Sequence, residues 1–111
     1  MILENVTQKT IVYPNIEIAS SFFDQLLGLL QHTKQAMLFY TRFGIHTFGM
    51  NRKIDVIVLD QKWKAAKIKK NLPSNSLFFW NPKLNIVIEL PSGTINKSKT
   101  EIGNVLKMHK K

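Results

Sequence analysis

Three histidines and seven carboxylates are the side chains of this 111-residue chain best suited to acid–base catalysis or metal binding, and cysteine is absent. The lack of thiols excludes disulfides, thiolate nucleophiles, iron–sulfur clusters and cysteine-based zinc sites. His32, His46 and His109 lie too far apart in the sequence to form a local metal-binding pair, so we predict neither a metal site nor a cofactor. His46 is the one histidine that we consider as a ligand or general base, with a hydrogen-bonded structural role as the alternative.

Two carboxylates lie among apolar neighbours. Asp55 is the second residue of the apolar run 54–59, and Glu89 lies inside the run 84–90. A carboxylate in such a place would have a raised pKa and could act as an acid or base. Alternatively, each could accept hydrogen bonds from backbone groups at the end of a sheet. Asp60 would project to the face opposite to Asp55, so we expect it to be a turn residue and not the second member of an acidic pair.

A loop between two glycines is the candidate for ligand binding. Gly44 and Gly49 bracket it, and it also holds His46 and Phe48. Spaced glycines let backbone N–H groups approach an anion, although this spacing is not that of a phosphate-binding loop. An enzyme with a pocket beside this loop, built from His46 and the two carboxylates among apolar residues, is one function that the sequence leaves open.

The formal net charge of +9 is unevenly distributed along the chain. Residues 1–55 hold five bases and four acids, whereas residues 56–111 hold eleven bases and three acids. Such a balance favours an anionic partner, for example nucleic acid or another polyanion. However, fourteen of the sixteen bases are lysine, which lacks the bidentate fork of arginine, so we favour a compositional origin of the charge and keep the functional one open.

Lysines are densest directly after the run 54–60. They are Lys62, Lys64, Lys67, Lys69 and Lys70. On a strand, positions 62, 64 and 70 would project to one side and positions 67 and 69 to the other. A nucleic-acid-binding sheet collects lysines and aromatic rings on one face, whereas an exposed edge strand uses lysines to prevent pairing with another sheet. We favour the edge strand and keep polyanion binding as an alternative.

The apolar pattern is mostly that of strands. They are predicted at residues 8–13, 37–41, 54–60, 63–69, 76–80, 84–90 and 104–108. Residues 20–30 have apolar side chains at helical spacing and predict one short N-terminal helix. Strands without alternating helices favour a mainly β fold, a compact antiparallel β-sandwich or barrel-like single domain over residues 1–111.

Short connections predict two hairpins in this fold. Residues 61–62 would join the strands 54–60 and 63–69, and residues 81–83 would join 76–80 and 84–90. The core is expected to include Phe48, Met50, Phe78, Phe79 and Trp80.

Four short stretches, taken in order, carry a resemblance to a known family. They are Gly28-Leu29-Leu30 leading into Ala36-Met37-Leu38-Phe39; His46-Thr47-Phe48-Gly49-Met50 followed by Ile54-Asp55-Val56-Ile57-Val58-Leu59-Asp60; Val87-Ile88-Glu89-Leu90-Pro91-Ser92-Gly93; and Ile102-Gly103-Asn104. Over about residues 20–106 the chain resembles the domain-of-unknown-function family 192, a group of small bacterial and archaeal proteins. The resemblance implies a compact, mainly β domain with a short helix. It implies no catalytic or binding residue, because none is established for the family.

The chain departs from the family pattern at two positions. Gly49 stands where many relatives carry a tryptophan before the methionine, and Asn104 stands where an aspartate is expected after the glycine. If that aspartate carried chemistry in relatives, this chain would lack it. Gly103 itself suits a backbone position with positive φ.

Three functions remain open from the sequence. The first is a non-enzymatic binding module for an unidentified partner or ligand, the second is polyanion binding, and the third is an enzyme with a histidine and carboxylate pocket. The first residues carry no signal-peptide pattern, and no apolar run is long enough to span a membrane, so we expect a cytoplasmic protein.

Overall fold

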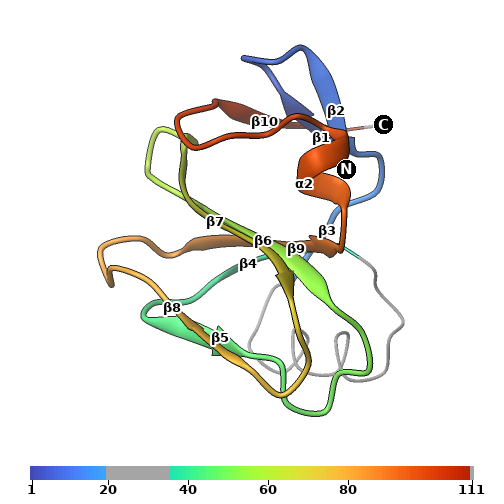
Figure 1. Cartoon of the computed structure of the whole chain (residues 1–111). Helices are drawn as coiled ribbons and strands as arrows, with labels where there is room; N and C mark the ends of the chain where they lie inside the picture. Colours follow the sequence, from blue (N-terminus) through green and yellow to red (C-terminus); the bar gives the residue numbers. More distant parts are fainter. Residues whose placement is uncertain (20–35, 111) are drawn as a thin grey trace.

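The structure is a computed structural model, and it describes residues 1–19 and 36–110. This part of the chain is mainly β, as predicted, and its elements are shown in Figure 1. In chain order they are β1 (Ile2–Asn5), β2 (Thr10–Tyr13), β3 (Glu17–Ile18), β4 (Met37–Tyr40), β5 (Gly44–His46), β6 (Ile54–Leu59), β7 (Ala65–Leu72), β8 (Leu77–Phe79), β9 (Ile86–Pro91), α2 (Thr94–Lys97) and β10 (Leu106–His109). The helix expected at 20–30 and His32 lie outside the described residues.

A five-stranded sheet with the order β3-β4-β9-β6-β7 forms the centre of the molecule. Its strand pairs are antiparallel except for the short parallel pair β3–β4. All six residues of β6 and the first five of β9 are buried, because these strands are covered on both faces. The apolar residues of β6 are typical of such a strand, and the strand predicted at 54–60 is confirmed over Ile54–Leu59.

Each face of the central sheet packs against a smaller sheet. On one face, Ile57 and Ile88 join a core cluster that includes Leu3 of β1 and Leu106 of β10. On the other face, Val56, Val58 and Val87 join a cluster that includes residues of β5 and β8. The smaller sheets have the orders β10-β1-β2 and β5-β8, and Figure 1 shows the three sheets as successive layers. Over the described residues none of these sheets is closed into a barrel, which corrects the barrel-like alternative.

The predicted hairpin between β6 and β7 is present. The two strands pair antiparallel, and the Asp60 carboxylate accepts hydrogen bonds from the backbone N–H groups of Lys62 (2.8 Å) and Lys64 (3.0 Å) in the turn. Asp60 is thus the turn residue that the sequence indicates. β7 lies at the edge of the central sheet, where the lysine pattern places it.

The second predicted hairpin is wrong. Residues 81–83 do form a turn, since the Leu84 N–H donates to the Asn81 carbonyl at 2.9 Å, but the flanking strands enter different sheets. β8 pairs with β5, whereas β9 pairs with β4 and β6. The physical reason is burial: β8 buries only Phe78, so it suits a layer with one wet face, while β9 is buried on both faces.

Candidate functional site

The two-stranded sheet β5–β8 presents apolar side chains to solvent. Its register pairs Gly44 with Phe79, Ile45 with Phe78 and His46 with Leu77. Ile45 and Phe78 are each 8% exposed and belong to the core. Since successive side chains of a strand alternate between faces, the neighbours of these two residues face outward.

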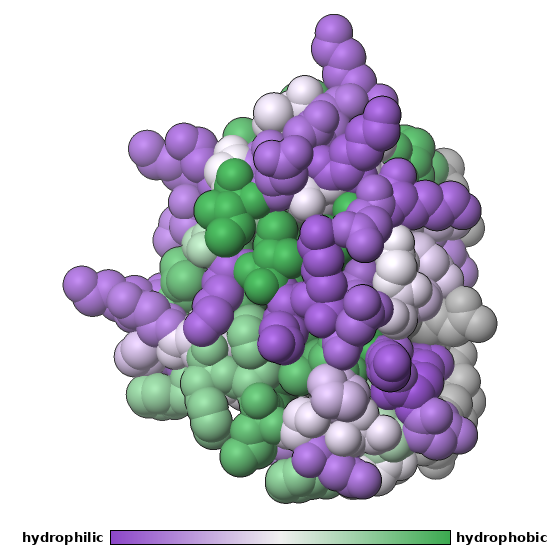
Figure 2. Space-filling view, viewed as in Figure 1, coloured by the Kyte–Doolittle hydropathy of each residue, from purple (hydrophilic) through white to green (hydrophobic). Residues whose placement is uncertain are grey.

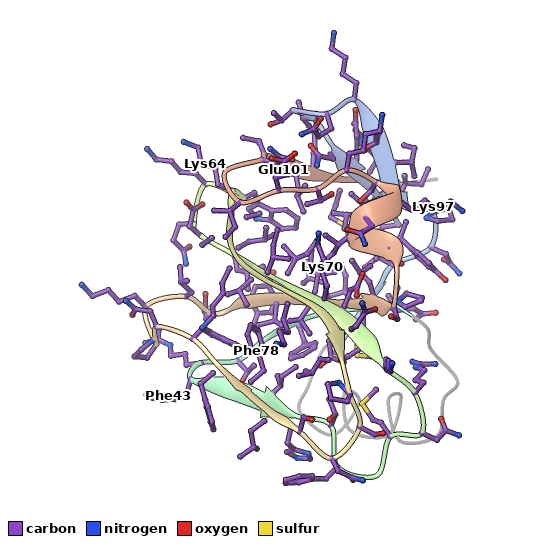
Figure 3. The ribbon with its side chains drawn as sticks, viewed as in Figure 1. Phe43, Lys64, Lys70, Phe78, Lys97 and Glu101 are labelled. Atoms are coloured by element: carbon purple, nitrogen blue, oxygen red, sulfur yellow. The ribbon has the colours of Figure 1, made fainter. Side chains whose placement is uncertain are left out.

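The outward side chains and the adjoining turns form one group, which we call the aromatic surface. It comprises Phe43, His46, Phe48, Leu77 and Phe79. The exposed fractions are 65% for Phe43, 59% for Phe79, 55% for Leu77 and 49% for Phe48. Figure 2 shows apolar atoms gathered over the end of the molecule that carries β5 and β8, and in Figure 3 Phe43 points outward while Phe78 points inward. Exposed apolar side chains gathered in this way are typical of an interaction site.

Gly44 sets the shape of this surface. A Cβ at this position would lie 2.5 Å from the carbonyl oxygen of Phe78 and 2.6 Å from Cδ1 of Phe79. The missing side chain therefore lets β8 approach closely and lets the Phe79 ring lean over the backbone of β5. The glycine that was expected as part of a ligand loop thus has a clear steric role.

The turn after β5 is fixed by buried hydrogen bonds. The Thr47 hydroxyl, fully buried, donates to the Pro73 carbonyl at 2.7 Å and accepts from the Ser76 N–H at 2.9 Å. Gly49 has φ +83, a conformation that glycine adopts without strain. Sequence reasoning missed Thr47, because a threonine in an apolar stretch does not reveal its hydrogen-bond partners.

His46 and Phe48 form a stacked pair on the outside of this turn. Their ring centroids lie 5.1 Å apart with an interplanar angle of 24°, and the Phe48 N–H donates to His46 Nδ1 at 3.3 Å. Both side chains are exposed. The expected core positions of Phe48 and Phe79 are therefore wrong, whereas Met50, Phe78 and Trp80 are buried as expected. An apolar residue type alone does not decide which side of a one-sided sheet it occupies.

The predicted lysines are divided between the faces of β7, as strand parity indicates. Lys67 reaches the aromatic surface: its Nζ donates to the Phe79 carbonyl at 2.7 Å and lies 5.1 Å from the centroid of the Phe78 ring. Lys69 has the same parity, since Lys67 and Lys69 pair with Val58 and Val56. Lys62 and Lys64 lie at the β6–β7 turn and its exit, and Lys70 faces the opposite side.

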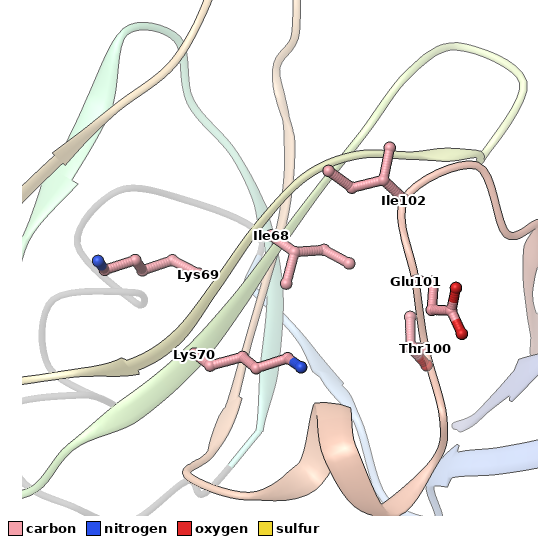
Figure 4. A pocket seen from close by; sticks show the side chains of 6 residues that line it. All are labelled: Ile68, Lys69, Lys70, Thr100, Glu101 and Ile102. Carbon is pink, nitrogen blue, oxygen red and sulfur yellow. The ribbon is translucent and has the colours of Figure 1, made fainter.

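A shallow cavity of about 580 Å³ lies on that opposite side. It is lined by Ile68, Lys69, Lys70, Thr100, Glu101 and Ile102. Figure 4 shows Ile68 and Lys70 pointing toward the 100–102 segment, Lys69 pointing away from it, and the Glu101 carboxylate turned from Lys70. The Thr100 hydroxyl is already engaged with Asn5 Nδ2 at 3.0 Å and with the Ser98 hydroxyl at 2.8 Å. The polar groups of this cavity therefore do not converge on a common point.

Asp55 is a buried acceptor for three backbone N–H groups. One carboxylate oxygen accepts from Asn71 at 3.0 Å, and the other accepts from Gly93 at 3.1 Å and Ile95 at 2.9 Å. These bonds join β6 to the neighbouring strand β7 and to the start of α2. Gly93 is the N-cap of α2 and has φ +96, so the Asp55 carboxylate takes the place of a capping side chain.

Glu89 is a buried carboxyl on the other face of the same sheet. It is 2% exposed, and its Oε2 has no hydrogen-bond partner among the described residues. It lies between Met37 and Val56 of the neighbouring strands. Burial raises the pKa of Glu89 to about 8, and the Arg52 guanidinium opposes this by lowering it. Glu89 is therefore mostly a neutral acid at pH 7.

The structure does not bring His46, Asp55 and Glu89 together. Asp55 lies on the face that packs against α2, and Glu89 lies on the face that packs toward β5 and β8. His46 is exposed and points away from its core neighbour Ile45, so it faces solvent and not the interior where Glu89 lies. The Gly44–Gly49 segment therefore contributes His46 and Phe48 to the aromatic surface and not to a pocket with the two carboxylates.

Asn104, the residue that departs from the family pattern, has a structural role. Its Oδ1 accepts from Asn5 Nδ2 at 3.1 Å, from Gln8 Nε2 at 3.2 Å and from the Glu101 N–H at 2.9 Å. An aspartate oxygen could accept the same three bonds. The asparagine therefore need not signal a lost reaction.

Two features are absent from residues 1–19 and 36–110. No helix in these ranges has the length and apolar character that crossing a membrane requires. No three His, Asp or Glu side chains in the same ranges gather where they could hold a metal ion.

Comparison with known families bears on the motifs. The model of the DUF192 family, described as “Uncharacterized ACR”, matches residues 3–108. This is the family that the four sequence stretches resemble, so the resemblance is confirmed. Among curated proteins, none matches this sequence.

Two solved structures are similar in fold. A protein from Sinorhizobium meliloti 1021, named a “putative transcription regulator”, superposes with a TM-score of 0.79 at 16% identity, covering 96% of this chain and 89% of that chain. A protein of unknown function from Novosphingobium aromaticivorans DSM 12444 superposes with a TM-score of 0.74 at 13% identity, covering 96% of this chain and 82% of that chain. At these identities the likeness shows the fold alone.

Proposed function

Because the chain belongs to the DUF192 family, whose members are described only as uncharacterised, we propose its function from its own surface: it is a non-enzymatic binding module whose contact site is the aromatic surface. The observation that carries the proposal is the exposure of Phe43, Phe48, Leu77 and Phe79 on one small sheet and its turns. The free energy of the system falls when a partner covers large apolar side chains that are exposed to water.

The supporting geometry is that of a preformed site. The missing side chain of Gly44 lets the Phe79 ring lie against β5, and hydrogen bonds of Thr47 fix the turn that carries His46 and Phe48. A surface whose side chains are already placed loses little conformational entropy on binding. The enzyme alternative has weaker support, because Asp55 already accepts three backbone hydrogen bonds and Glu89 lies on the other face of the central sheet.

We also propose that residues 1–111 form a single domain of antiparallel sandwich type. The support is the packing of the β10-β1-β2 sheet on one face of the central sheet and of β5-β8 on the other. Such an arrangement gives the binding surface a rigid base.

Site-specific photo-crosslinking tests the binding proposal even when the partner is unidentified. A photoreactive benzoyl-phenylalanine would replace Phe79, which is 59% exposed, or Ile11 of β2, which is 56% exposed in the sheet that covers the other face of the central sheet. We expect irradiation of living cells to give a discrete adduct from position 79 and none from position 11. The absence of an adduct from positions 79, 48 and 43 alike would overturn the proposal. Nuclease and protease digestion would then assign any adduct to nucleic acid or protein.

A further inference from the structure

We infer that the aromatic surface binds single-stranded nucleic acid, with the rings of Phe79, Phe48 and His46 stacking on bases and the lysines around them meeting phosphates. This inference rests on the proposed function and names the chemical class of the partner. It uses three observations: the sign of the charge around the surface, the presentation of the rings, and the place of Lys67.

The chain segments that carry the aromatic surface have charges of one sign. β5, β8 and the turns beside them belong to the segments 36–54 and 61–88, which together contain nine lysines and arginines and no aspartate or glutamate. Arg42, Lys69 and Lys83 are exposed members of this group. A surface with this charge attracts polyanions and repels basic partners.

The rings are presented in the way that base stacking requires. The Phe79 ring leans over Gly44, whose missing side chain leaves room for it on the β5–β8 sheet. Phe79 is 59% exposed. His46 and Phe48 are stacked on each other at the end of the same ribbon, so their outer faces remain open to a further planar group. Proteins that bind single strands place aromatic rings on a sheet in this way, because every base has a flat apolar face.

Lys67 places a positive charge at β8, beside the aromatic surface. Its ammonium group is held at the Phe79 carbonyl and beside the Phe78 ring. The phosphate of a base stacked on Phe79 would lie near a lysine that already donates to the backbone of that residue. An ammonium group has three N–H donors, so Lys67 can keep its bond to the Phe79 carbonyl and still donate to a phosphate oxygen.

A single strand fits these features better than a duplex or a lipid surface. In a duplex the bases stack on each other and offer no face to Phe79 or Phe48. Peripheral membrane anchors present an unbroken apolar face to the lipid, whereas here His46 lies beside Leu77 in the surface and the Lys67 ammonium group lies next to it, at the Phe79 carbonyl. Both alternatives give distinct outcomes in the test.

The test is fluorescence anisotropy with a labelled oligothymidylate of about 12 nucleotides, a length within the range that such sites cover. This probe, and the same strand annealed to its complement, would be titrated with four proteins: the wild type, Phe79→Leu, Phe79→Trp and the control Ile11→Leu. Phe79→Leu keeps an apolar side chain and removes the ring. We expect it to lower the affinity for the single strand about tenfold, while Phe79→Trp and Ile11→Leu retain the wild-type affinity.

Salt dependence and vesicle binding complete the test. Lys67→Gln should reduce the slope of log affinity against log salt by about one, whereas Lys97→Gln on α2 should leave it unchanged. Equal affinity for duplex and single strand, or an unchanged affinity in Phe79→Leu, would overturn the inference. Failure to bind the strand together with binding to phosphatidylserine vesicles would also overturn it. A protein adduct at position 79 in the crosslinking experiment would overturn this inference and leave the proposed function intact.

Discussion

At the scale of single residues, the two buried carboxylates have different physical situations. Asp55 accepts three backbone N–H bonds, whereas Glu89 lies between Met37 and Val56 and its Oε2 has no partner among the described residues, although the two residues lie in neighbouring central strands. Hydrogen bonds from three N–H groups offset the cost of burying the Asp55 carboxyl group, whereas burial without a partner for Oε2 favours the neutral form of Glu89. The sequence could identify both as unusual, but not distinguish them, because the partners of Asp55 come from distant segments.

Asp55→Asn is predicted to lower the free energy of unfolding by about 2–4 kcal/mol, because hydrogen bonds to a charged acceptor are strong and the asparagine amide offers one acceptor oxygen in place of two. Urea unfolding at pH 7 would measure the change. Asp60→Asn, in the half-exposed β6–β7 turn, is the matched control and should cost less than about 1 kcal/mol. Equal effects of the two substitutions would contradict the structural role assigned to Asp55.

The raised pKa of Glu89 predicts that the free energy of unfolding falls as the pH rises. Its folded-state pKa of about 8 is above the ordinary value of 4.5, so the folded chain binds a proton that the unfolded chain releases. The stability contribution is complete below pH 4.5 and is lost as the pH rises toward 8. Between about pH 5 and pH 8 we expect a loss of about 3 kcal/mol.

The Glu89→Gln variant isolates the contribution of Glu89 to the pH dependence of stability from that of the other titratable groups. The amide cannot ionise, so the variant should lose less stability than the wild type over the same pH range and should be the more stable protein at about pH 8. Urea unfolding of both proteins at several pH values would measure the difference. Parallel pH profiles for the two proteins would show that Glu89 does not titrate in this range.

At the scale of elements, glycines at the turns and at the ribbon have unequal roles. Gly44 is needed for close approach, because a Cβ there would meet the backbone of Phe78. Gly93 is needed only for its positive φ of +96, since a Cβ there would meet nothing within 4 Å. Steric overlap with backbone cannot be relieved by a side-chain rotation, whereas a left-handed conformation has a fixed cost.

Gly93→Ala is therefore predicted to cost about 1–2 kcal/mol, and Gly44→Ala to cost more and to displace β5 from β8. Thermal unfolding would measure both effects, and amide chemical shifts of residues 43–50 and 76–80 would detect the displacement. A Gly44→Ala variant with unchanged shifts in these segments would contradict the role of Gly44 in shaping the aromatic surface.

The sequence predicted some elements well and one pairing badly, for a physical reason. The pairing of β6 with β7 was predicted correctly, because these strands are adjacent in the sequence and local hydrogen bonds to Asp60 close their turn. A short turn alone does not decide the pairing, since residues 81–83 join strands of different sheets. The pairing of β8 with β5 depends on contacts between segments that are distant in the sequence, which local pattern does not encode. Phe79 was expected in the core for the same reason, and the candidate site was recognised only in part, through Gly44, His46, Phe48 and Gly49.

At the scale of the whole molecule, the exposed phenylalanine rings distinguish the two sides. The side with β1, β2, β10 and α2 is held together by buried polar groups such as Asn5 and Asn104. The side with β5 and β8 leaves apolar rings in water among basic residues. We therefore expect binding on the second side only.

The location of binding can be measured directly by titrating the isotope-labelled protein with the unlabelled oligothymidylate and following its amide resonances. We predict shifts that saturate with the strand and are concentrated in residues 43–50, 67–69 and 77–79, with residues of β1, β2 and α2 unaffected. Shifts concentrated on β10, α2 or the cavity beside Lys70, with β5 and β8 unaffected, would contradict the assignment of the aromatic surface as the contact site.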